Sequence, residues 1–564
     1  MVTVGDEAWV YWRRVEPHLS RILSRVDRES FSLTYGSLDR VFWNWKFTDF
    51  AGARFQEGVF TLAFLYATPF QGNTFQGNPH LLRWARAALG NWVGLQYPDG
   101  SFDEAYPGER SLAATAFTGF YVGEGFRRLR SWIPEAEAAG VVAALTAAGE
   151  WLCRNDETHG VLSNHLAAAA AACHVIGEVV GDPRFFARRD HFVDRILRCQ
   201  SAEGWYEEYG GADPGYQTHA TFYLGWIWRA TRDARLLESL GRASAFLEYC
   251  LHPDGTMGGE YGSRNTEFQF PAGYEILAGV SPEAARIALF MRRGMAKNVV
   301  VGPDAMDAQN IFPIVNNYLL ALDAALGEQR LELAATGELP WQRRERRYFA
   351  DAGLYFVSEE RYYAIFAASK GGCLKVFDRQ GEKLHGMDAG YWGVMPSGKA
   401  ISSQALVRSP AVERGEEGIL ARGRFVRVNQ RLFNPWLFLG FRLFTLIFGR
   451  HPGAARWIKG MLVRVLVRRR REEPLEWQRR VAFLPQRVQV WDRLTRSAPL
   501  ALNRLRRDEK FSAIHMGSAR YYQPQEIAIL PRTEAEVQAE DAALREQLQR
   551  QGWAEVEFAF DWSR

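Results

Sequence analysis

The chain has 564 residues, of which 47% are hydrophobic and 24% charged, so it is globular and long enough for two or more domains. Its net charge of +4 is local, because residues 442–471 hold nine Lys or Arg and no acid, leaving 60 basic against 65 acidic residues elsewhere. This balance excludes a generally basic, nucleic-acid-coating protein, and we expect no nucleic-acid partner.

The first thirty residues alternate charged and aromatic side chains and contain no continuous apolar stretch of the kind that directs export. The five cysteines have no CxxC or other metal-ligand spacing, which is typical of free thiols in a reducing compartment. We therefore expect a cytoplasmic protein, peripheral at the inner membrane face at most, with no metal and no cofactor.

A loose repeat of turns runs through the first half of the chain. "QYPDGSF", "CRNDETHGV", "CQSAEGW" and "CLHPDGTM" each follow a helical pattern, and their glycines, 60, 44 and 51 residues apart, are Gly100, Gly160, Gly204 and Gly255. About fifty residues accommodate two helices of roughly 20 residues each, so the repeat predicts stacked helical hairpins. We expect these glycines to serve the turns themselves.

The alanine-rich stretches at 111–123 and 166–173 favour a closed double ring over an open solenoid, because small residues let inner helices approach closely. From about residue 347 the pattern alternates, is rich in Tyr, Phe and Val and returns at 419–433 and 479–494, which predicts strands. The sequence therefore predicts an (α/α) toroid over 1–340 and an antiparallel β-sandwich over 347–564, with a late helix at 532–551.

A basic and apolar segment, 431–471, interrupts the predicted sandwich. Residues 432–449 are nearly all apolar, but Pro435 and Arg442 disfavour a bilayer span. Such a segment suits either an anionic membrane surface or an apolar hairpin packed on the ring, with a solvated basic end.

Candidate site residues fall in the loops that begin the predicted inner helices, on one rim of the ring. Elimination across a uronic acid needs donors that neutralise the carboxylate, a base for the C5 proton and an acid for the departing glycosidic oxygen. Asn164, His165 and Tyr216 supply these roles, with Arg264 able to assist. The other polar residues that we expect to bind substrate are Trp45, Lys46, Arg54, Gln56, His219 and Glu260.

With an Asn-His step on an inner helix and a Tyr about fifty positions later, the layout resembles the heparinase II/III type of polysaccharide lyase. The resemblance implies that Asn164 and His165 are catalytic together with Tyr216, 52 positions beyond Asn164, or with Tyr223, 59 positions beyond. It also implies an acidic polysaccharide or glycolipid substrate and β-elimination without a metal.

One departure from that family concerns the sandwich, where its members carry a His-rich "HxHxD"-like turn that contributes another catalytic His. This chain has "SKGGCLKVFDRQGEKLHGMDAGYWG" instead, in which His385 or Lys370 could compensate.

Three other readings fit the sequence. A glycoside hydrolase on the same toroid would need two carboxylates about 5–9.5 Å apart, for which the acids are Asp39, Asp49, Asp99, Glu208 and Glu260. A non-catalytic protein that binds envelope glycans fits the same aromatic richness. A terpenoid-cyclase-like enzyme is disfavoured because no DxDD-like acid motif is present.

Overall fold

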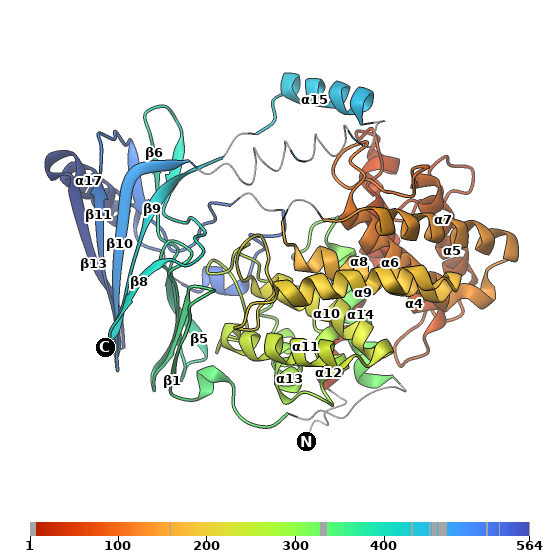
Figure 1. The fold of residues 1–564 in the computed structure, drawn as a ribbon, viewed down its shortest axis with the longest axis horizontal. Coiled ribbons are helices and arrows are strands. Elements are labelled where there is room, and N and C mark those ends of the chain that lie inside the picture. The colour runs from red at the N-terminus through yellow and green to blue at the C-terminus, as the bar shows by residue number, and fades with distance from the viewer. Residues whose placement is uncertain are drawn as a thin grey trace.

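The computed structural model describes residues 7–157, 160–327, 335–429, 432–449, 453, 460, 471–514, 517–529 and 531–562. Helices fill the N-terminal part, and two antiparallel sheets form a second part beside it (Figure 1). The predicted fold class, an α/α toroid followed by an antiparallel β-sandwich, is confirmed.

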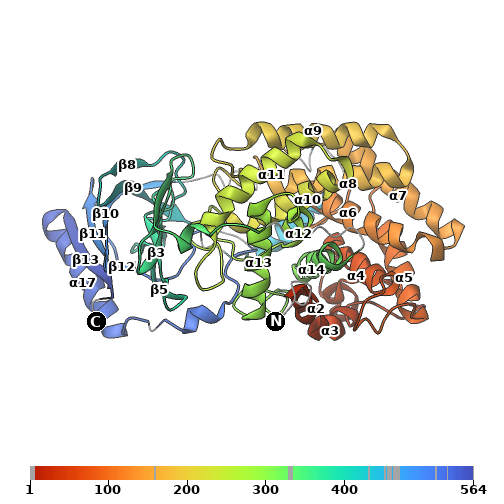
Figure 2. The same ribbon diagram turned by 90° about the horizontal axis from the view of Figure 1, so that it is seen from below.

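The inner layer of the toroid is a closed ring of helices. Each inner helix packs on the next along the chain, and the last one, α14, packs back on the first, α4. The view in Figure 2 looks onto this layer. Its helices are α4 (Gly58–Ala67), α6 (Leu112–Leu129), α8 (Ser163–Val180), α10 (Pro214–Thr231), α12 (Ala272–Leu277) and α14 (Ile311–Leu326).

Small residues bring the inner helices together, as the alanine-rich stretches predict. The six alanines of α8 from Ala167 to Ala172 are completely buried. A Cβ on Gly119 of α6 would lie 3.5 Å from that of Ala172, and one on Gly273 of α12 would lie 2.7 Å from the backbone of Phe222 in α10. Side chains of ordinary size at these places would push neighbouring helices apart, so the ring closes only with small ones.

The outer layer consists of amphipathic helices, several of which have a side-chain N-cap. Asn78, Asp182, Asp233 and Ser281 each cap one of these helices through a side-chain oxygen, and three of the caps precede a proline at the first helical position. The outer helices are α2 (Val10–Val15), α5 (Pro79–Leu95), α7 (Glu135–Arg154), α9 (Pro183–Cys199), α11 (Ala234–Leu247) and α13 (Pro282–Ala296).

Three of the four repeated glycines dock their turns on outer helices. Gly100 and Gly204 have φ of +96° and +102°, and a Cβ there would lie 2.1 Å from the Ala147 carbonyl oxygen and 2.3 Å from that of Arg242. Gly255, with φ of +91°, lies less tightly against α13: a Cβ there would be 3.3 Å from Gly294 Cα. Glycine suits these positions because it tolerates a positive φ and has no Cβ to collide with the neighbouring helix. The repeat therefore marks the places where each helical hairpin packs against the next.

A glutamine four residues before the glycine completes two of these turns. The side-chain amide of Gln96 donates to the Gly100 and Ala144 carbonyls, and that of Gln200 donates to the Gly204 and Ser239 carbonyls.

The first sheet is the middle layer of the molecule. Its antiparallel strands follow chain order: β1 (Glu345–Phe349), β2 (Leu354–Ser358), β3 (Tyr362–Ala367), β4 (Cys373–Asp378) and β5 (Lys383–Asp388). Alternate residues of β3 belong to different cores: Tyr363 and Ile365 pack with the toroid, whereas Ala364 and Phe366 pack with the second sheet. Both faces of β2 and β3 are buried, which is why these two strands are almost continuously apolar.

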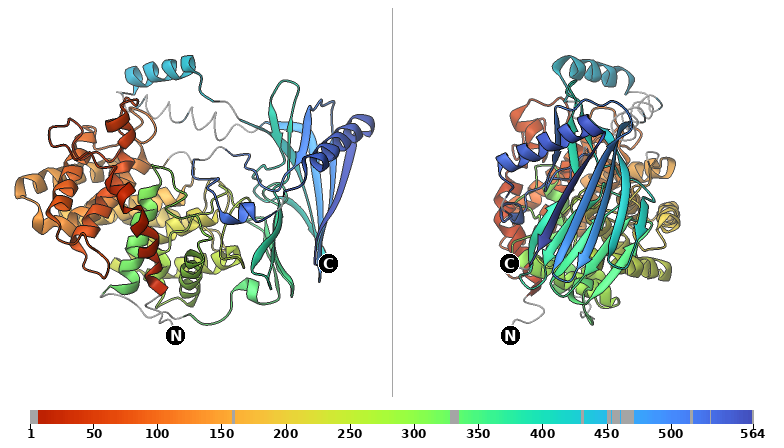
Figure 3. Two further views of the ribbon diagram at one scale, coloured as in Figure 1. Left: turned by 180° about the vertical axis from the view of Figure 1, so that it is seen from behind. Right: turned by 90° about the vertical axis from the view of Figure 1, so that its left-hand side faces the viewer.

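The second sheet forms the layer on the side of the first sheet that faces away from the toroid (Figure 3). Its path runs β12-β6-β7-β9-β10-β11-β13, with β8 paired to β9, and helix α17 (Glu534–Gln551) packs on β12 and β13. The strands are β6 (Tyr391–Val394), β7 (Ala400–Ser402), β8 (Ala411–Arg414), β9 (Gly418–Val428), β10 (Glu472–Leu484), β11 (Arg487–Arg496), β12 (Arg504–Arg507) and β13 (Trp553–Asp561).

The predicted basic and apolar segment leaves the sheet between β9 and β10. Its first part forms helix α15 (Pro435–Phe448), which lies over the toroid at the edge of the molecule in Figure 1, whereas most of 450–470 lies outside the described residues. By length and composition one described helix, α7, could cross a membrane, but it packs against α5, α6, α8 and α9 within the ring.

Candidate functional site

A cavity of about 120 Å³ opens at the N-terminal ends of the inner helices. It collects side chains from the start of α8 and α10, from α6, from the loop before α12 and from the start of α14. Helix N-termini carry partial positive charge, so this rim favours an anionic ligand. The lining residues include Arg54, Glu104, Phe117, Asn164, His165, Tyr216, His219, Phe268, Phe270, Asn310, Ser518 and Tyr521.

The Asn164 side chain is buried, and it does not cap its helix. The N-cap position of α8 is Leu162, and no side chain caps it, whereas the Asn164 amide donates to a Glu208 carboxylate oxygen at 2.9 Å. The Asn164 carbonyl oxygen has no hydrogen-bond partner among the described residues. Because a buried polar atom without a partner costs free energy, this one marks a place where a ligand can bind.

Glu208 is the buried carboxylate behind Asn164. Burial raises its pKa to about 7, although the positive charges of Arg264 and His165 and the Asn164 amide act in the opposite direction. The charge of this group therefore changes near neutral pH, beside an amide that faces the cavity.

Two histidines face the cavity and differ in environment. His219 lies between the rings of Phe117 and Phe270, with centroid distances of 5.4 and 4.0 Å, and its Nε2 has no partner among the described residues. Burial, together with the charge of Arg54, holds the pKa of His219 well below its usual range, so the imidazole is neutral. His165 instead pairs its Nδ1 with a Glu157 oxygen at 3.0 Å.

Tyr216 lies one helical turn before His219 on α10, so the two side chains share a face. Its hydroxyl is 2.6 Å from the Ser518 hydroxyl, and burial raises the pKa of the phenol above its usual range. Tyr216 is therefore protonated at neutral pH.

Asp213 fixes this end of α10. One of its oxygens accepts from the Tyr216 backbone amide and from the Thr266 hydroxyl, and the other accepts from the Arg264 backbone amide at 2.8 Å. The Arg264 guanidinium lies over the ring of Tyr209, 3.8 Å from its centroid. Arg264 is thus close to Glu208 and Tyr216 but does not line the cavity.

The structure brings together five of the predicted site residues, which all line the cavity: Arg54, Asn164, His165, Tyr216 and His219. Arg54 is anchored at its edge by Glu57 at 2.7 Å and Glu104 at 3.2 Å.

Tyr223 lies deeper in the ring. It is completely buried and packs on the rings of Phe117, Phe120 and His219 without lining the cavity. Of the two competing tyrosines, Tyr216 lines the cavity and Tyr223 does not.

Four other predicted binding residues lie outside the cavity as well. Gln56 is buried and holds the Leu38 amide and the Gly36 and Ala88 carbonyls, which is a structural task. Trp45 and Lys46 are exposed at the end of a short π-helix. His385 stacks on Trp562 in the sheet region, with 4.1 Å between ring centroids.

Lys370, the alternative to His385, is completely buried. Its ammonium donates to the Gly262 and Ser263 carbonyls and to the Asn265 side chain at 2.8–3.0 Å. It therefore ties the first sheet to the loop before α12, and neither residue supplies the family's missing histidine at the cavity.

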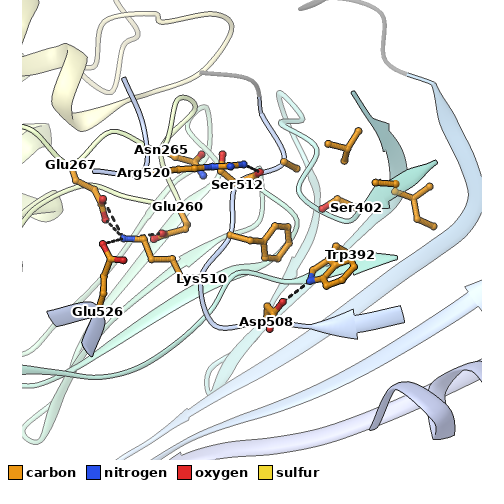
Figure 4. Close-up of a pocket in the computed structure, with 15 residues that line it drawn as sticks. Glu260, Asn265, Glu267, Trp392, Ser402, Asp508, Lys510, Ser512, Arg520 and Glu526 are labelled. Atoms are coloured by element: carbon orange, nitrogen blue, oxygen red, sulfur yellow. Dashed lines mark hydrogen bonds and ion pairs between the residues drawn. The ribbon is translucent and has the colours of Figure 1, made fainter. Parts of the chain in front are cut away.

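Glu260 lies in a different and larger cavity of about 480 Å³, between the toroid and the second sheet (Figure 4). It pairs with Lys375 at 3.3 Å, while Lys510 contacts Glu267 at 3.1 Å and Glu526 at 3.0 Å. Each of these three carboxylates has a lysine partner within 4 Å, so we take the first cavity, where Asn164 and His219 keep unpartnered polar atoms, as the better candidate for catalysis.

Sequence reasoning missed the contribution of the C-terminal part to the ring. Ser518 and Tyr521 follow β12, yet they line the cavity, and the Tyr521 hydroxyl donates to Asp307 at 2.9 Å. No local pattern signals this contact, which spans 302 residues between Tyr216 and Ser518. Among the described residues no group of three His, Cys, Asp or Glu could hold a metal ion.

Comparison with known proteins agrees with this architecture. Residues 46–275 match the family model of the ulvan lyase N-terminal domain. No curated protein is significantly similar in sequence to the chain.

Two solved structures share its fold. Xanthan lyase from Paenibacillus has a TM-score of 0.53 and 9% identity over 89% of this chain and 47% of its own. Chondroitin AC lyase from Streptomyces coelicolor A3 has a TM-score of 0.52 and 12% identity over 90% of this chain and 68% of its own. The chain thus spans about half the length of the xanthan lyase. It has the fold of the toroid-and-sheet polysaccharide lyases, and its N-terminal domain matches the ulvan lyase type.

Proposed function

We propose that the chain is a polysaccharide lyase that cleaves a uronic-acid-containing glycan by β-elimination in the cavity at the inner-helix N-termini. The observation that carries the proposal is the meeting of Asn164, Tyr216 and His219 in one anion-favouring cavity. Of their side chains, Asn164 and His219 each keep a buried polar atom without a partner among the described residues.

The environments of these residues suit them to different roles in the reaction. Asn164 donates one of its two amide hydrogens to Glu208, and we assign the second to the uronate carboxylate, which makes the C5 proton more acidic. His219 is held neutral, so it can accept that proton, and Tyr216 is held protonated, so it can donate to the departing glycosidic oxygen. The electron pair of the C5–H bond then forms the C4–C5 double bond as the C4–O bond breaks.

The hydrolase alternative finds less support. Among the residues that line the cavity within the described chain, Glu104 is the carboxylate, and Arg54 engages it at 3.2 Å. A hydrolase needs a second carboxylate across the scissile bond.

The experiment is an ultraviolet assay of the purified chain on acidic polysaccharides, including ulvan, xanthan and chondroitin, that follows the absorbance of the unsaturated uronate. We expect the absorbance to rise with at least one uronate glycan. Asn164→Ala and Tyr216→Phe should each slow that rise by about 10²-fold or more. New reducing ends without that absorbance would indicate hydrolysis, and binding without turnover would indicate a glycan-binding protein. The cytoplasmic location stays a prediction, which cell fractionation tests.

A further inference from the structure

Helix α15 presents an unusual surface. Within residues 432–449 of the described chain, ten large apolar side chains are 45–91% exposed: Leu432, Phe433, Trp436, Leu437, Phe438, Leu439, Leu443, Leu446, Ile447 and Phe448. A contiguous apolar surface of this kind marks an interaction site, because water solvates it poorly.

The helix is nevertheless fixed to the toroid along one stripe. Arg442 pairs with Asp49 at 3.1 Å, and Phe441 packs edge-on against Tyr106 with 5.2 Å between ring centroids. Gly449, one turn beyond the buried Thr445, lies so close to Gly108 that a Cβ on Gly108 would be 3.0 Å away. The remaining faces of α15 stay exposed, and the helix lies at the periphery of the molecule (Figure 3).

We propose that α15 is an interfacial anchor that binds the surface of an anionic lipid bilayer. Its 14 residues make a helix of about 21 Å, shorter than the roughly 30 Å hydrocarbon core, so it suits the interface and not a span. The exposed Trp436 is of the residue type that prefers this interface.

The positive charge of the sequence around α15 favours an anionic lipid surface over a second copy of the chain as the binding partner. Residues 442–471 carry nine Lys or Arg and no acid, so an anionic surface attracts this part of the sequence, whereas another copy would bring the same positive charge. An apolar helix next to a basic sequence is the combination that anionic membranes bind.

The anchor lies beside the candidate site. The loop that holds Arg442 through Asp49 leads into the short helix Ala53–Glu57, which carries Arg54. The loop that meets α15 through Tyr106 also carries Glu104. If the proposed lyase function holds, its substrate is a glycan at or attached to a lipid surface. Membrane binding itself does not depend on that function.

The test is cosedimentation of the purified full chain with vesicles of phosphatidylcholine alone or mixed with phosphatidylglycerol. We expect binding to the anionic vesicles that weakens as salt rises, and at least tenfold weaker binding for a Leu443→Ser, Leu446→Ser, Ile447→Ser variant. The matched control is Phe31→Ser with Leu33→Ser, whose side chains are 86% and 104% exposed on another part of the toroid. That control should bind like the original chain.

Circular dichroism should show that each variant is folded. Because the vesicle assay needs no catalysis, the membrane proposal can fail while the lyase proposal stands, and the reverse. No binding to anionic vesicles, or binding that the α15 variant leaves unchanged, would overturn the proposal. A dimer seen by light scattering that the same α15 variant dissociates would also overturn the proposal, because a second copy of the chain would then occupy the exposed face of α15.

Discussion

The Asn164 amide donates a 2.9 Å hydrogen bond to Glu208, and both side chains are buried at the start of α8 and the adjoining turn. The bond fixes the amide at the cavity wall without using its carbonyl oxygen. The Glu208 carboxylate thus positions an amide whose carbonyl oxygen can accept a hydrogen bond from a donor on the substrate, such as a sugar hydroxyl.

Replacing Asn164 by Ala should lower kcat/KM on a uronate glycan by about 10²–10³-fold, as the loss of one preorganised polar group in an active site does. Steady-state kinetics by the ultraviolet assay measure it. Asn78→Ala is the matched control, because Asn78 caps the outer helix α5; we expect about 1 kcal/mol lower stability and unchanged kinetics. Equal activity of Asn164→Ala and the original chain would contradict the role given to Asn164.

Substitution of Tyr216 and of Tyr223 should have different effects on kcat. Tyr216→Phe removes a hydroxyl at the cavity and should reduce kcat by about 10²–10⁴-fold, the range for loss of a general acid. Tyr223→Phe, which changes a buried ring outside the cavity, should leave kcat within a few-fold. The reverse pattern would assign proton transfer to Tyr223.

Glu208 should make the stability of the chain, and the binding of substrate in the proposed site, depend on pH. Its pKa is raised from 4.5 to about 7 in the folded chain, so the folded state binds the proton more tightly than the unfolded state. Stability is therefore lost as pH rises from about 4.5 to 7, by on the order of 3 kcal/mol. Above pH 7 the carboxylate also repels an anionic substrate, and KM should rise.

Glu208→Gln should remove both effects, which urea unfolding and KM measured from pH 5 to 8 detect. Glu267, whose pKa burial and Glu260 also raise to about 7, lies in the other cavity. Glu267→Gln should change the pH dependence of stability but leave that of KM intact.

The sandwich core contains a buried charge network. Arg479, 2% exposed, donates to Asp388 at 2.6 Å and to both oxygens of Asp492 at 2.6 and 2.8 Å. Arg479→Met removes the cation that pairs with Asp492 and one of the two that pair with Asp388, the other being Arg507 at 3.1 Å. It should lower the free energy of unfolding by about 3–5 kcal/mol in urea titrations. Arg422→Met, on an exposed pair with Glu413, should cost less than about 1 kcal/mol.

The turn glycines permit a matched comparison. Gly204 and Gly210 both have positive φ, but a Cβ on Gly204 would meet the Arg242 carbonyl at 2.3 Å, whereas one on Gly210 would meet nothing within 4 Å. Thermal unfolding should show a loss of about 1 kcal/mol for Gly210→Ala from backbone strain alone. Gly204→Ala should lose clearly more, because the turn must also move off α11.

The sequence by itself determined the architecture and the rim on which the candidate site lies. The repeated turn glycines, the alanine-rich stretch 166–173 and the strand pattern from about 347 are local signals, since helix spacing, turn geometry and strand alternation depend on near neighbours. The same signals placed Asn164, His165 and Tyr216 at helix starts, where the structure has them.

Tertiary structure alone decided which of those polar residues meet. Gln56 and Tyr223 have suitable side chains but face the core, and His385 lies in the sheet region, whereas Ser518 enters the cavity from a distant part of the chain. Ring closure and sheet packing set these distances. They arise from contacts between residues hundreds of positions apart, and no local pattern in the sequence encodes them.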